Sequence, residues 1–144
     1  MQQQQQHSHH PRHQPLYQSH EYTAKELIRC KKWMQDALRY SGGSYRIQDI
    51  FYDILQGNMQ LWSGLHGCMV TQIVTYPQKK VFFVFLAGGK LDQLYEMEDD
   101  MTDWAREQGC SEIELNGRLG WMKVLKNKNW NVQSVTLTKE IKNG

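Results

Sequence analysis

The sequence predicts an α/β (α+β) protein with a mixed central sheet that is flanked by helices on both faces. Three observations predict this fold class. Two long segments, 23–40 and 91–108, repeat apolar residues at helical spacing. Between them, residues 59–87 carry β-type patterns that are separated by turn residues. Finally, the stretch from Trp104 to Trp130 fits a helix end, a strand, a tight turn, a second helix and the approach to a last strand.

Length and composition point to one compact domain. The chain has 144 residues, of which 40% are hydrophobic, so it can bury one core. Its 17 basic and 15 acidic residues nearly balance, and this argues against a nucleic-acid partner recognised by charge alone. Residues 1–20 hold five consecutive glutamines and clustered histidines, which cannot build a core. We therefore expect a disordered tail over 1–20 and a single domain over 21–144.

The tail and the cysteines suggest no cofactor chemistry. His7, His9 and His10 could share a divalent metal, but no acidic or thiol ligand accompanies them, so no metal site is assigned. Cys30, Cys68 and Cys110 are widely spaced and are expected to be buried, reduced thiols. A catalytic pair of Cys68 with His66 is the alternative, and packing is favoured over it. We expect a soluble protein, because there is neither a signal peptide nor an apolar run long enough to span a membrane.

The helices before the sheet have recognisable boundaries. Thr23 and Glu26 have capping-box spacing, and the first helix is expected over 23–40, before Ser41-Gly42-Gly43. A shorter helix should follow, with Ser44 as its cap and Gly57 after its end. The apolar stripes of both helices predict that they cover a sheet.

Three strands are expected next, over 59–63, 68–76 and 80–87, as an antiparallel meander. The third is apolar on both faces, which predicts a central strand covered on both sides. A turn at Gly88-Gly89-Lys90 should lead into the helix over 91–108, whose early carboxylates suit the helix dipole. A strand over 111–115, a turn at Asn116-Gly117, a helix over 118–126 and a strand over 132–138 complete the prediction.

This order of elements resembles the GCN5-related N-acetyltransferase (GNAT) fold over residues 23–140. GNAT proteins bind the acyl-CoA pyrophosphate with backbone amides between the fourth strand and the long helix. The resemblance implies that acetyl-CoA would be held there by Ala87, Gly88, Gly89 and Lys90, although the sequence lacks the family's full glycine pattern.

The last helix is compared with the family pattern Asn-x-x-Ala-x-x-Leu-Tyr-x-Lys-x-Gly-Phe. If Trp130 and Asn129 stand at the final Phe and Gly, Leu125 stands at the Tyr. That tyrosine is the family's usual general acid, and leucine has no proton to give. The other matched positions are Arg118, Trp121 and Val124.

The residues left as candidates for chemistry are few. Glu112 or Glu114 would be the general base of a working acyltransferase. Arg118, just behind Gly117, either anchors a phosphate or carboxylate or pairs with an acidic residue of the domain.

The block Gly117-Arg-Leu-Gly-Trp121, with Gly109-Cys110 before its strand, resembles a group of small phage-encoded GNAT-like proteins. Some of these are packaged or assembled with virions. The resemblance implies a non-catalytic or degenerate acyltransferase scaffold that acts with other virion proteins, in the virion or in the bacterial host cytoplasm. The alternative is an active acetyl-CoA-dependent N-acyltransferase with an unknown amine acceptor, so enzymatic activity stays open. Nucleic-acid binding is weaker, because Trp33, Trp62, Trp104 and Trp121 occupy core-like positions.

Overall fold

A computed structural model describes residues 15, 20–117, 125 and 129–142 of the chain. Its elements confirm the predicted fold class and, over residues 20–117, the predicted order. They are α2 (His20–Leu38), α3 (Ile47–Leu55), β1 (Gln60–Ser63), β2 (Gly67–Thr75), β3 (Lys80–Gly89), α4 (Leu91–Glu107) and β4 (Glu112–Leu115). Within this part of the chain, no helix is both long enough and apolar enough to cross a membrane.

The described strands form one mixed sheet in the order β1-β2-β3-β4. The first three strands pair as the predicted antiparallel meander. β4 pairs with β3 in parallel, because α4 carries the chain back across the sheet between them. β3 is therefore an internal strand, as its apolar sequence predicts.

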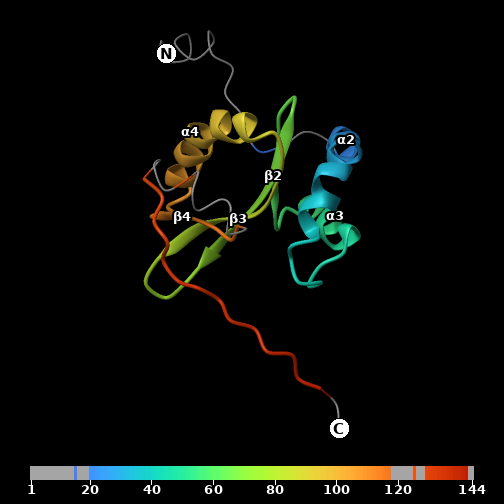
Figure 1. Cartoon of the computed structure of the whole chain (residues 1–144). Helices are drawn as coiled ribbons and strands as arrows, with labels where there is room; N and C mark the ends of the chain where they lie inside the picture. Colours follow the sequence, from blue (N-terminus) through green and yellow to red (C-terminus); the bar gives the residue numbers. More distant parts are fainter. Residues whose placement is uncertain (1–14, 16–19, 118–124, 126–128, 143–144) are drawn as a thin grey trace, which may run out of the picture.

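Helices cover both faces of the sheet (Figure 1). Helices α2 and α3 lie on one face, where Leu27, Met34 and Ile50 are buried with Val70. Helix α4 lies on the other, where Met97 and Met101 pack against Trp62 and Phe82. The two-sided burial explains why β3 carries large apolar residues at consecutive positions.

A buried hydrogen-bond chain lies inside the core under α4. The Trp62 indole Nε1 donates to Thr71 Oγ1 at 3.0 Å, and the Thr71 hydroxyl donates to Gln60 Oε1 at 2.8 Å. Trp62 also makes edge-on ring contacts with Phe82 and Trp104. The indole can be buried completely because its only polar hydrogen has an acceptor.

The starts of the first two helices differ from the prediction. Thr23 does not cap a helix: α2 begins at His20, and Thr23 is buried inside it. Glu26 bonds to Arg29 and Ser63 instead of to a cap. The N-cap of α3 is Arg46 rather than Ser44, and the Arg46 amide donates to the Asp49 carboxylate at 2.8 Å. Burial of Thr23 and the Asp49 carboxylate at Arg46 thus replace the two caps that the sequence pattern predicts.

The predicted turn at Gly88-Gly89 is also wrong, because β3 continues through both glycines and pairs with Gly67 and Cys68. Gly89 has a φ of +98°, and a Cβ there would overlap the Gly67 Cα. Glycine is therefore required where β3 ends and α4 begins.

The predicted last strand is wrong in this structure. Residues 131–142 belong to no strand, and the segment runs away from the body of the protein (Figure 1). Its alternating sequence favours an extended backbone, but a strand also needs a neighbour with which to pair. The predicted helix over 118–126 lies outside the described residues except for Leu125, which is helical and buried.

We predict that Thr71→Val destabilises the protein by about 1–3 kcal/mol, because it leaves the buried Trp62 Nε1 without its acceptor. Urea unfolding measures this change. Thr75→Val is the matched control, since Thr75 is exposed at the end of the same strand. Equal effects of the two substitutions would contradict a role for the buried hydrogen bond.

Candidate functional site

The site is built around a bulge in β3. The register between β2 and β3 shifts between Val70 and Thr71, so Phe85 is an extra residue on β3. Before the bulge, Val84 packs toward α4, whereas both Phe85 and Leu86 pack into the core beneath α2 and α3. Pairing with β4 also stops at Val84. From Phe85 to Gly89, β3 thus runs without β4 beside it in the described part of the chain.

An apolar slot lies where β3 and β4 separate. Its lining comes from both strands, from α4 and from the C-terminal region, and includes Val84, Ala87, Leu94, Ile113, Leu125 and Trp130. The free volume inside it is only ≈30 Å³, which is far below the roughly 300 Å³ of a small-molecule pocket. The side chains themselves, Leu125 and Trp130 among them, fill most of this position.

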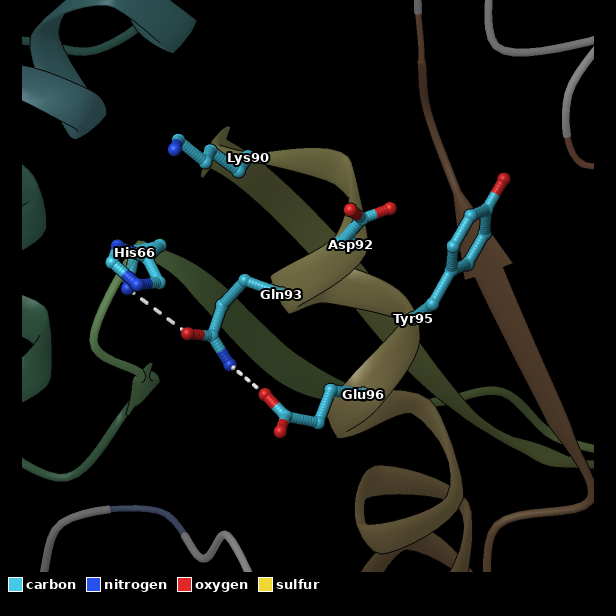
Figure 2. A pocket seen from close by; sticks show the side chains of 6 residues that line it. All are labelled: His66, Lys90, Asp92, Gln93, Tyr95 and Glu96. Atoms are coloured by element: carbon cyan, nitrogen blue, oxygen red, sulfur yellow. Dashed lines mark hydrogen bonds between the residues drawn. The ribbon is translucent and has the colours of Figure 1, made fainter.

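The turn between β1 and β2 lies against the N-terminal end of α4. The Lys90 amide donates to the His66 carbonyl oxygen at 2.9 Å, and the His66 amide donates to Gln93 Oε1 at 2.9 Å. Gln93 Nε2 in turn donates to Glu96 Oε1 at 2.7 Å (Figure 2). The buried Gln93 side chain thereby connects the turn to the first two turns of α4.

The same turn is held from the other side of the sheet by α2. Arg29 Nη2 donates to the Gly64 carbonyl oxygen at 2.8 Å, while its guanidinium pairs with the Glu26 carboxylate at 3.0 Å. A Cβ on Gly64 would overlap the Gln93 side-chain amide. The turn over residues 64–67 is therefore held between α2 and α4, and a larger residue at Gly64 would require the Gln93 amide to move.

A second, open hollow of ≈540 Å³ lies at this end of α4. Lys90 supplies its cation, but Asp92 and Glu96 supply two carboxylates, and His66 and Tyr95 complete the lining with Gln93 (Figure 2). Asp92 lies in the first turn of α4, where the helix dipole favours a carboxylate. Two carboxylates and one lysine thus line the hollow.

Of the described residues predicted for the cofactor, only Lys90 lines this hollow. Ala87 lines the apolar slot, and Gly89 lies against the turn of residues 64–67. Gly88 faces α2, since a Cβ there would stand 2.6 Å from the Trp33 carbonyl oxygen. The predicted Arg118 lies outside the described residues.

The structure does not bring Glu112 and Glu114 to that end of the sheet. Glu112 is opposite Val81 on β3. Val81 precedes Gly88 by seven residues, so the two positions are roughly 23 Å apart along the strand at 3.3 Å per residue. Lys79 Nζ lies 3.0 Å from each Glu112 carboxylate oxygen, and this contact raises the lysine pKa. The two candidate bases are thus distant from the residues predicted for the cofactor.

The thiols confirm the packing interpretation for two of the three cysteines. Cys30 and Cys68 are buried, whereas Cys110 is half-buried. A hydrogen bond with Cys30 and burial both raise the pKa of Cys68, so it stays a thiol at neutral pH. His66, the proposed basic partner, is exposed and contacts the site through its backbone.

Sequence reasoning missed Gln93 and Tyr95. Gln93, Met97 and Met101 recur every four residues, a spacing that places Gln93 on the buried face of α4. A polar residue in such a row needs a partner, and this could have drawn attention to it. Tyr95 lines both the slot and the hollow, and its phenol oxygen is buried.

Comparison with known proteins adds fold evidence. No protein-family profile and no curated protein matches the sequence. An aminoglycoside acetyltransferase from an uncultured soil metagenomic sample, solved with sisomicin, is 11% identical with a TM-score of 0.65, over 91% of this chain and 96% of that one. A ribosomal-protein-alanine N-acetyltransferase from Brucella melitensis biovar Abortus 2308 is 13% identical with a TM-score of 0.56, over 81% and 96%.

These likenesses concern the arrangement of the backbone. With the mixed sheet, the β3 bulge and α4 between two parallel strands, they establish that the chain has a GNAT-like fold. A shared fold alone does not assign the ligands or substrates of these similar proteins to this chain.

We predict that Glu26→Gln lowers stability at pH 7 by about 1 kcal/mol or less. The Arg29 hydrogen bond holds the pKa of Glu26 below its usual 4.5, and it outweighs partial burial, which acts the other way; Ser63 adds to the lowering. Because the folded pKa is below the unfolded one, this stabilisation is present above pH 4.5 and is lost as pH falls through the folded pKa. Urea unfolding of the unaltered protein and of Glu26→Gln across pH 3–7 measures this difference in stability. A difference that persists at the acid end would contradict this assignment.

Proposed function

We propose that this protein is a GNAT-like scaffold without acyl-transfer activity, which acts through contacts with other proteins in a phage virion or during its assembly. The first half of the proposal rests on the site described above. The second half rests on the resemblance of Gly109-Cys110 and the block over residues 117–121 to phage-encoded proteins.

One observation carries the proposed loss of activity: the β1–β2 turn takes the Lys90 amide at the N-terminal end of α4, where the resemblance implies a pyrophosphate site. A phosphate cradle needs several unpaired amides that converge at a helix N-terminus. Here the Lys90 amide donates to His66, and the Gln93 and Leu94 amides donate to the Lys90 carbonyl oxygen. The Asp92 carboxylate adds charge of the wrong sign. These two features support the proposal that the end of α4 binds an acyl-CoA pyrophosphate poorly.

The apolar slot supports the same conclusion. An acyl-pantetheine chain would have to enter between β3 and β4, where ≈30 Å³ is free. Leu125, which the sequence comparison matches to the usual tyrosine acid, is 8% exposed and lines this slot. It contributes apolar packing at this position and has no proton to donate.

An active acyltransferase is the second candidate, because two observations favour it. The bulge at Phe85 turns backbone groups out of the ladder, and such groups can stabilise an oxyanion. Tyr95 brings a phenol to the slot, where it offers the proton donor that Leu125 lacks. For this candidate to hold, the pyrophosphate would have to bind in the hollow beside Asp92 and Glu96.

We predict that neither acetyl-CoA nor CoA, at about 1 mM, shifts the amide resonances of residues 86–94. The reason is that the Lys90 amide already donates to the His66 carbonyl oxygen and that two carboxylates, Asp92 and Glu96, line the hollow at this end of α4. Shifts at these residues that disappear in Lys90→Glu and persist in Lys25→Glu, an exposed control on α2, would overturn the proposal. Acetyl transfer that is lost in Tyr95→Phe would then establish the second candidate.

The assembly role gives a separate prediction. If the protein acts in the virion, it is retained in purified particles of the phage that encodes it after a high-salt wash, because protein interfaces of standard size survive salt better than charge-driven adhesion. Mass spectrometry of washed particles measures this. Its absence both from particles and from assembly intermediates would contradict the assembly role and leave the conclusion on acyl transfer untouched.

A further inference from the structure

Two thiols that take no part in the candidate site meet between α2 and β2. Cys30 lies on α2 and Cys68 on β2, and the two residues are 0% and 1% exposed in the same core. Their side chains share a hydrogen bond. Among the described residues, no group of three or more metal-binding side chains includes them. The chemistry open to this pair is therefore that of two neighbouring thiols.

The surroundings of the pair give the two thiols different roles. Cys68 donates its S–H to Cys30, and this hydrogen bond lowers the pKa of Cys30. The Arg29 guanidinium acts in the same direction on this pKa, whereas burial and the Glu26 carboxylate oppose it. The same hydrogen bond, together with burial, raises the pKa of Cys68. Cys30 thus loses its proton first, and the thiolate is the form of cysteine that reacts with oxidants.

Arg29 links the buried pair to the protein surface. Its guanidinium interacts with both thiols, and its side chain is 39% exposed. It also pairs with the Glu26 carboxylate and donates to the Gly64 carbonyl oxygen, so it helps to hold α2 against the β1–β2 turn. Local opening of α2 at Arg29 would admit a small oxidant to the two sulfurs.

We propose that Cys30 and Cys68 form a redox-sensitive pair, which hydrogen peroxide or a related peroxide converts into a disulfide that locks α2 to β2. A disulfide requires the two sulfurs to approach to about 2.05 Å, and thiols that share a hydrogen bond already face each other at short range. The bond closes a loop that contains α3 and β1. Reducing surroundings keep the pair as thiols, whereas oxidising surroundings favour the disulfide.

The reaction proceeds in two balanced steps. The Cys30 thiolate attacks one oxygen of the peroxide and breaks the O–O bond, which leaves a sulfenic acid on Cys30 and releases hydroxide that takes up the thiol proton as water. The Cys68 sulfur then attacks the sulfur of the sulfenic acid, forms the S–S bond and releases a second water. Two thiols and one hydrogen peroxide thus give one disulfide and two waters.

The first experiment identifies the thiols that react. The full chain is oxidised with an excess of hydrogen peroxide, once under native conditions and once in urea, and is digested without reduction for mass spectrometry. Under native conditions we expect the loss of two hydrogens and peptides linked through Cys30 and Cys68. In urea we expect mixed links that include Cys110, which is half-buried and belongs to the other core. The same mixture under native conditions, or oxidation of Cys110 alone, would overturn the proposal.

A matched pair of variants tests the order of the two steps. Cys110→Ala should form the disulfide as the unaltered protein does. Cys68→Ala should stop at the sulfenic acid of Cys30, which dimedone traps. Amide spectra verify that each variant is folded, and if Cys68→Ala is not, the linked peptides of the first experiment decide alone. A disulfide that still forms in folded Cys68→Ala would overturn the pairing.

The melting temperature measures whether the disulfide locks the structure. We expect oxidation to raise the Tm by at least about 5 °C, because the bond restricts the unfolded chain, and reduction with dithiothreitol to reverse the rise. Cys110→Ala should show the same rise and Cys68→Ala none. A linked pair whose Tm does not rise would overturn the lock. None of these outcomes depends on whether the protein transfers acyl groups.

Discussion

The contact on which the site depends is the hydrogen bond from the Lys90 amide to the His66 carbonyl oxygen. It extends the pairing of β2 and β3 by one more step, up to the point where α4 begins. Two side chains reinforce it from opposite faces of the sheet, Gln93 from α4 and Arg29 from α2. One short turn therefore links both helical layers to the end of β3.

The bulge at Phe85 has a similarly wide effect. It changes which residues of β3 face each core, and so places Leu86 with the α2 and α3 helices and Ala87 with α4. It also marks the end of the pairing between β3 and β4. The slot at this separation is lined mostly by apolar side chains, and only ≈30 Å³ inside it is free.

The predicted site illustrates how far a sequence comparison reaches. Leu125 was matched to the position of the usual acid, and the structure places it in the slot as a buried residue. The glycines of the predicted loop do lie at the start of α4, but their surroundings differ: Gly88 faces Trp33, and Gly89 lies against Gly67. The sequence could not reveal this, because Gly67 and His66 are more than twenty residues away along the chain. Glu112 and Glu114 lie far from these glycines for a related reason, since the register of parallel strands depends on the crossover and not on local sequence.

What the sequence by itself determined is local and periodic: helices from apolar spacing, the meander from alternation and turns, and a central β3 from apolar residues on both faces. These features depend on which side chains of a segment are apolar and must be buried, and the sequence of that segment alone determines this. The tertiary structure alone decided the features that require two distant segments to meet. The pairing of His66 with Lys90, the burial of Gln93 and the bulge belong to this group. The segment over residues 131–142 follows the same rule. Its alternating residues favour an extended backbone, but it becomes part of a sheet only where a neighbouring strand edge is available to pair with it.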